Sequence, residues 1–212
     1  LMDEPFFACL SRKLEKKEDR SIQTAGVYVN EQTGQFEMIY NPEFLDSLPE
    51  NQIKGVLKHE FYHLIFDHVT SRKPEGVPHK TWNIAADLAI NSHLVGELPA
   101  FACMPGVGPF ENLPKLKSAE WYLKNITDDQ VDQCGHGAGT GEDGEGEPGT
   151  GQLDDHSGWD DKADSPAQEA AKQMAKERLK QAMKEAASEA SKSPNGWGTI
   201  GGELKKDILK KL

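Results

Sequence analysis

The chain has few cysteines, a modest apolar content and no excess of basic residues. Its 212 residues include three cysteines, Cys9, Cys103 and Cys134. An odd number of widely spaced cysteines favours a reducing compartment over a disulfide framework. No apolar run approaches the roughly 20 residues of a membrane span, and the N-terminus lacks the basic-then-apolar order of a signal peptide. These absences predict a cytoplasmic protein that does not associate with membranes.

The net charge of −11 is concentrated in one segment. Residues 128–164 hold twelve acidic residues and a single basic one, Lys162, so they account for the whole net charge. The rest of the chain is close to neutral and has no basic stripe, which excludes nucleic acid as a partner. Within this segment, residues 135–151 are rich in glycine and acid, and we expect them to be mobile because little apolar surface offsets the entropy of ordering.

Hydrophobic spacing predicts an α+β fold that is mostly helical and has one small sheet. We expect a helix over residues 5–19 and a β-hairpin over residues 25–41, with its turn at Thr33-Gly34. Further helices are expected over residues 47–71 behind a capping box at Ser47, over 82–96, over 118–126 behind Ser118, and over 166–192 behind Ser165. Composition divides the chain into a core (1–127), an acidic glycine-rich loop (128–164), and a long surface helix with an amphipathic tail (165–212).

The segment His59-Glu60-Phe61-Tyr62-His63 matches the HExxH motif of zinc peptidases. On a helix, residues i and i+4 lie about 40° and one turn apart, so both imidazoles can reach one metal ion. Glu60 lies about 100° from His59, where a general base can accept a proton from an activated water. The flanking apolar residues indicate a buried helix, in which these polar groups need compensation. We interpret the stripe as a metal site; hydrogen-bonded core histidines are the alternative.

A catalytic zinc site needs a third protein ligand. His68 is nearest in sequence, but on a continuous helix it faces about 180° away from the first histidine of the motif. Asp67 is closer in angle, but a third ligand further along the same helix would strain the metal geometry. Asp87 is the better candidate. It stands between Asn83 and Asn91 in a polar stripe at i, i+4 and i+8 on an otherwise apolar helix, and the two amides can support a carboxylate ligand. The alternative is a buried carboxylate that ties helix to loop.

Motifs over most of the chain resemble a metallopeptidase domain family of phage and bacterial proteins, often associated with a von Willebrand factor A-like domain. The segments that carry the resemblance are "PFFACL", "YNPEFLDSLPE", "GVLKHEFYHLIFDH", "WNIAADLAIN" and "DDHSGWDD". The resemblance implies a zincin-like fold, with the small sheet packed on the HExxH helix. It implies Zn²⁺ on His59 and His63, Asp87 in the same site, and Glu60 as the catalytic base. It also implies a von Willebrand factor A-like partner domain, either C-terminal or separate.

The implied reaction is hydrolysis of a peptide or protein substrate. Zinc would polarise the scissile carbonyl and activate water, and Glu60 would pass the proton to the leaving amine. For the oxyanion donor we select His156, in the segment "DDHSGW", although a solvated loop histidine is the alternative. The runner-up function is a zincin-shaped binding or adaptor module with a structural or latent metal. The intact Glu60 argues against it, because a structural site has no use for a base.

Overall fold

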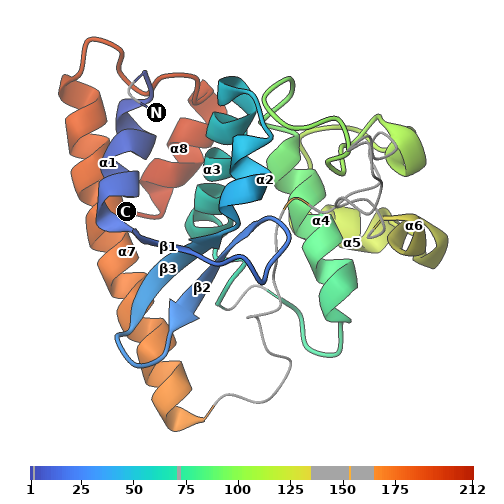
Figure 1. Cartoon of the computed structure of the whole chain (residues 1–212), viewed down its shortest axis with the longest axis horizontal. Coiled ribbons are helices and arrows are strands. Elements are labelled where there is room, and N and C mark those ends of the chain that lie inside the picture. Colours follow the sequence, from blue (N-terminus) through green and yellow to red (C-terminus); the bar gives the residue numbers. More distant parts are fainter. Residues whose placement is uncertain (2, 71–72, 135–152, 154–164) are drawn as a thin grey trace. The chain divides into compact units, whose positions relative to one another are not determined.

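The computed structural model of the chain describes residues 1, 3–70, 73–134, 153 and 165–212 (Figure 1). The architecture is mixed α+β, mostly helical with one small sheet, as predicted. Its elements are α1 (Pro5–Lys13), β1 (Glu15–Glu18), β2 (Ala25–Asn30), β3 (Gln35–Tyr40), α2 (Pro42–Asp46), α3 (Glu50–Ile65), α4 (His79–Asn91), the 3₁₀ turn η1 (Gly108–Phe110), α5 (Ala119–Asn125), α6 (Asp128–Gln133), α7 (Pro166–Lys192) and α8 (Gly202–Lys210). The glycine-rich stretch expected to be mobile, residues 135–151, lies outside the described residues.

Segments that are far apart in the sequence assemble into two compact units. One unit comprises Leu1–Lys17, Tyr28–Met38 and Lys162–Leu212, and the other comprises Glu18–Val27 and Ile39–Asp161. The division predicted from composition, at residues 127 and 164, stays a prediction. Among the helices that the structure describes, none is long and apolar enough to cross a membrane.

The sheet has the strand order β1-β3-β2, and the predicted hairpin forms its β2–β3 pair. Gly34 lies at the hairpin turn with φ 58°, a conformation that glycine adopts without strain. The helix predicted over residues 5–19 is too long, because Leu14 is extended and Glu15–Glu18 form β1. Lysine and glutamate favour helix by propensity, but pairing with β3 outweighs that weak preference.

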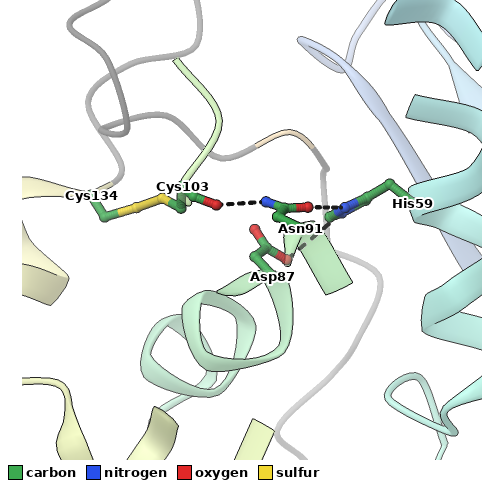
Figure 2. Close-up of a disulfide and its surroundings, with 5 residues drawn as sticks. All are labelled: His59, Asp87, Asn91, Cys103 and Cys134. Carbon is green, nitrogen blue, oxygen red and sulfur yellow. Dashed lines mark hydrogen bonds and ion pairs between the residues drawn. A yellow bond between two sulfur atoms is a disulfide. The ribbon is translucent and has the colours of Figure 1, made fainter. Parts of the chain in front are cut away.

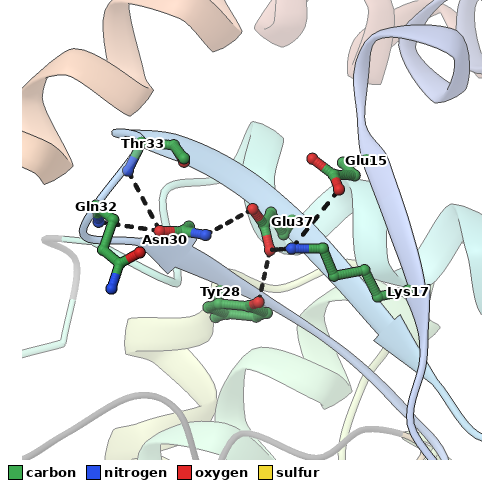
Figure 3. A network of polar contacts seen from close by, with 7 residues as sticks. All are labelled: Glu15, Lys17, Tyr28, Asn30, Gln32, Thr33 and Glu37. Atoms are coloured by element: carbon green, nitrogen blue, oxygen red, sulfur yellow. Dashed lines mark hydrogen bonds and ion pairs between the residues drawn. The ribbon is translucent and has the colours of Figure 1, made fainter.

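A buried glutamate on β3 organises the polar face of the hairpin (Figure 3). The Glu37 carboxylate accepts hydrogen bonds from Lys17 Nζ at 2.8 Å, Tyr28 Oη at 2.6 Å and Asn30 Nδ2 at 2.7 Å. Burial by itself would raise the pKa of Glu37, but the three donors outweigh burial and lower it. Glu37 is therefore held as a carboxylate, and its charge acts in turn on the neighbouring phenol.

Tyr28 is expected to titrate well above the ordinary tyrosine range. Partial burial is the largest cause and the hydrogen bond to Glu37 is the next, and they raise the pKa of Tyr28 to about 12. Because the folded-state pKa is raised, this contribution to stability is full below pH about 10 and is lost as pH rises through about 12. Ultraviolet difference absorbance of wild type against Tyr28→Phe measures the titration. Glu37→Gln should return the pKa toward 10.0, and an unchanged value in that variant would contradict the assigned cause.

Helix α7 is the long helix predicted behind Ser165, with the predicted bounds. The Ser165 side chain accepts from the backbone N–H of Gln168, whose amide oxygen accepts from the Ser165 N–H, so a reciprocal capping box begins the helix. Helix α7 lies beside α1 (Figure 1) and buries a stripe of mostly alanine residues with Leu179 and Met183. This face makes α7 part of the core of its unit, although its overall composition is polar.

The core of the second unit is built around α4. Every residue of α4 from Trp82 to Asn91 is buried, and α3, α5 and α6 all contact this helix. The predicted cap Ser118 begins α5, whereas α6 was not predicted. The apolar cluster around α4 comprises Trp82, Ile84, Ala85, Ala86, Leu88, Ala89, Cys103, Phe110, Ala119, Tyr122, Val131 and Cys134.

Two interpretations from the sequence, on a helix cap and on the cysteines, are wrong. The capping box predicted at Ser47 does not form, because the Ser47 hydroxyl donates to Phe44 O at 2.6 Å and closes α2 instead. Helix α3 begins at Glu50, after Pro49, which offers no side-chain cap. The cysteines are not all free either, since Cys103 and Cys134 form a disulfide and Cys9 alone stays a buried thiol. Spacing could not show this pair, because the fold brings together residues 31 apart in sequence.

Candidate metal centre

Helices α3 and α4 bring three predicted ligands together. His59 and His63 lie one turn apart on α3, and Asp87 comes from the middle of α4. All three side chains are fully buried. One ligand atom from each residue lies within 4.8 Å of the others, and these three residues form the candidate metal cluster of the described chain. The spacing argument from the sequence therefore identified a group that converges in space.

The separations of the three candidate ligand atoms are close to those around a small divalent ion. His63 Nε2 lies 3.0 Å from His59 Nε2, and Asp87 Oδ1 lies 3.4 Å from His63 Nε2 and 3.7 Å from His59 Nε2. A tetrahedral ion with zinc-like bonds of about 2.0–2.2 Å separates its ligands by roughly 3.3–3.6 Å. The donor set of two imidazoles and one carboxylate is also one that catalytic zinc sites use. The residues present thus fit such an ion.

Glu60 is the second fully buried carboxylate of this region. It follows His59 on α3, so its side chain starts about 100° around the helix axis from the histidine stripe. Two buried carboxylates carry a large desolvation cost as anions, which a divalent cation beside two neutral imidazoles would offset. The other predicted catalytic residue, His156, lies outside the described residues.

The Nδ1 side of the His59 ring contacts Asn91, the last residue of α4 (Figure 2). His59 Nδ1 lies 2.7 Å from Asn91 Oδ1, and Asn91 Nδ2 donates to the backbone carbonyl of Cys103 at 2.7 Å. Cys103 carries the disulfide to Cys134. The two amides were predicted to support Asp87, whereas the contact that the structure shows for Asn91 is with His59, and Asn91 is itself fixed by a loop carbonyl.

His68 also belongs to the site, in a place that sequence reasoning missed. Helix α3 ends at Ile65, not near residue 71, because Asp67 adopts a left-handed conformation with φ 61°. Asp67 N–H donates to Leu64 O at 3.1 Å and His68 N–H to His63 O at 3.0 Å, the two bonds of a Schellman motif. This turn folds His68 back until its Nδ1 lies 3.2 Å from His63 Nδ1.

The geometry agrees with the comparisons with known proteins. The chain belongs to the family described as "Putative metallopeptidase domain", which matches residues 1–208. A 69-residue segment is 33% identical to an uncharacterized protein of Thermotoga maritima, and it covers 32% of this chain but only 17% of that relative. No solved structure matches the chain. The resemblance inferred from motifs is confirmed, while the association with a von Willebrand factor A-like domain stays a prediction.

In this metallopeptidase-family chain, close packing fixes the helix that carries both histidines. Lys58 is almost fully buried, and its Nζ donates to Glu97 Oε2 at 2.6 Å. One turn before His59, Gly55 leaves room for the backbone of Glu97: a Cβ on Gly55 would lie 1.9 Å from Glu97 O. Glycine is thus required here by close approach rather than by backbone conformation.

Gly55→Ala is expected to destabilise the protein by about 3 kcal/mol, because the added methyl group must push a backbone carbonyl away. An ordinary Gly→Ala change inside a helix stabilises by about 1 kcal/mol, so the sign of the effect is diagnostic. Denaturant unfolding of the metal-free protein provides the measurement. The matched control is Gly202→Ala in α8, where a Cβ meets nothing within 4 Å and no loss is expected. A stabilised Gly55→Ala protein would show that α3 is not packed this closely.

Proposed function

We propose that this chain is a zinc-dependent peptidase with a zincin-like fold that hydrolyses peptide or protein substrates. The observation that carries the proposal is the convergence of His59, His63 and Asp87 at ligand separations of 3.0–3.7 Å. Membership of a metallopeptidase family supports the same reaction class. The family supports a metal in general, and the separations and the donor chemistry favour zinc.

Each site residue has a separate task in this proposal. His59, His63 and Asp87 would hold the ion, which when bound supplies a Lewis acid that polarises the scissile carbonyl and activates water. Glu60 would accept the proton of the attacking water and later donate it to the leaving amine. The position of Glu60 beside the histidine stripe, rather than on it, leaves its carboxylate available for proton transfer.

Metal removal is expected to abolish peptide hydrolysis reversibly. Elemental analysis of protein purified without chelator should find about one zinc per chain, as a mononuclear catalytic site holds. Hydrolysis of a mixture of internally quenched peptides should stop after treatment with a chelator and return when zinc is added. A chain that takes up no zinc would show that the site interpretation is wrong. Bound zinc without hydrolysis of any peptide would favour the adaptor function.

A further inference from the structure

We propose that Asn91 is the positioning residue for His59, and that it selects the ring form in which Nε2 carries the lone pair that can bind a metal ion. The proposal rests on the metal site of the proposed function, but not on its peptidase activity. Asn91 is fully buried at the end of α4, and its side-chain oxygen lies 2.7 Å from His59 Nδ1. The question is which of these two atoms carries the hydrogen.

The polarity of this contact follows from the Cys103 carbonyl (Figure 2). A carbonyl oxygen can only accept, so the Asn91 atom that lies 2.7 Å from it must be the NH₂ group. The Asn91 carbonyl oxygen then faces His59, and because this oxygen also can only accept, His59 Nδ1 must be the donor. A neutral imidazole with its hydrogen on Nδ1 has its lone pair on Nε2. That atom is the one beside His63 and Asp87.

The acceptor that fixes Asn91 is itself held in place. Cys103 is fully buried and belongs to the apolar cluster around α4. Its disulfide to Cys134 ties the loop that carries this carbonyl to the residue after α6. The orientation of Asn91 therefore depends on backbone and a covalent cross-link, and not on a second mobile side chain.

The contact between His63 and His68 is of a different kind. His63 Nδ1 lies 3.2 Å from His68 Nδ1, and an imidazole nitrogen can either donate or accept. The contact between two rings allows the hydrogen to lie on either Nδ1, so it does not determine the ring form of His63. The contact of Asn91, in contrast, defines which nitrogen of His59 can bind a metal ion. Partners of this type contribute about 10–100-fold to metal affinity.

Zinc affinity, measured by competition with a chromophoric chelator, tests the proposal with the metal alone. Asn91→Leu is expected to bind zinc about 10–100-fold more weakly. Asn91→Asp keeps an acceptor for His59 but loses the donor to Cys103 O, so it should lose less affinity than Asn91→Leu. The matched control is Ser92→Val, which also replaces a buried polar residue with an apolar one, at the position next to Asn91. The Ser92 hydroxyl donates to Leu88 O at 2.8 Å and lies 3.1 Å from Tyr122 Oη, so these contacts are with residues outside the metal site.

Nitrogen NMR of the imidazole rings in metal-free protein provides a readout that a merely structural role would not change. His59, assigned by its loss in His59→Gln, should show the Nδ1–H form in wild type and Asn91→Asp but a mixture in Asn91→Leu. Unchanged zinc affinity in Asn91→Leu, an equal loss in Ser92→Val, or an Nε2–H ring in wild type would overturn the proposal. If wild type bound no zinc, the proposed function would fail, and the ring spectrum would still decide the role of Asn91.

Discussion

Glu60→Gln is expected to lower peptide hydrolysis by about 10²–10⁴-fold, the usual contribution of a positioned general base. Glutamine has almost the same shape as glutamate but cannot accept a proton at neutral pH. The variant should keep its zinc, because the ion would be held by the two histidines and Asp87. Initial rates on quenched peptides and elemental analysis of the same preparation separate the chemical defect from loss of the metal.

The matched control is Glu50→Gln at the first turn of the same helix. The Glu50 side chain is 83% exposed and pairs with Lys54 on the surface, so both hydrolysis and stability should stay close to those of wild type. Activity retained in Glu60→Gln would exclude Glu60 as the base. Loss of both zinc and activity would instead indicate that Glu60 helps to hold the ion.

The three candidate ligands could be predicted because helical geometry is regular. The spacing of His59 and His63 by four residues requires both imidazoles to share a face, and that relation does not depend on the rest of the fold. Asp87 could be identified by a similar argument, since the charge of an acid in a buried apolar helix must be offset by a partner. Its convergence with the histidines additionally required α3 and α4 to contact each other, as they do across the connection over residues 66–78.

The residues that support the candidate ligands were harder to predict, because their positions depend on where helices end and how loops turn. His68 was placed on the wrong side of α3 by assuming a continuous helix. Asp67, in place of the glycine usual at this position of a Schellman motif, gave no signal that the helix stops. The contact of Asn91 with Cys103 O, and the disulfide at Cys103, depend on the loop after α4, whose path has no periodic pattern to follow.

The first strand shows the same limit in another form. Residues 15–18 read as helix because each is a good helix former, yet they pair along β3. All four are exposed, so burial gives them no alternating pattern. A strand of this kind is determined by its partner strand, and periodicity in the sequence reports burial rather than strand pairing. Residues buried on regular helices do leave a periodic pattern, which is why the candidate site residues on α3 and α4 could be found from the sequence.

Asp87→Asn is expected to remove most of the stabilisation that zinc gives to the folded chain. At zinc concentrations 1,000 times its dissociation constant, wild type should gain about 4.1 kcal/mol. If the amide weakens binding by about 100-fold, the upper end of the effect of a supporting partner, the variant gains only about 1.4 kcal/mol under the same conditions. For a chain of this size the difference corresponds to roughly 5–11 °C in melting temperature.

Thermal unfolding with chelator and with zinc measures this difference within each protein, so effects of the substitution on the metal-free chain cancel. The matched control is Asp132→Asn on α6. The Asp132 side chain is 83% exposed and lies 3.7 Å from Lys80, and its zinc-induced shift should equal that of wild type. An undiminished shift in Asp87→Asn would exclude Asp87 as the third ligand. The search would then move to His68, because the Schellman turn already places its ring against His63.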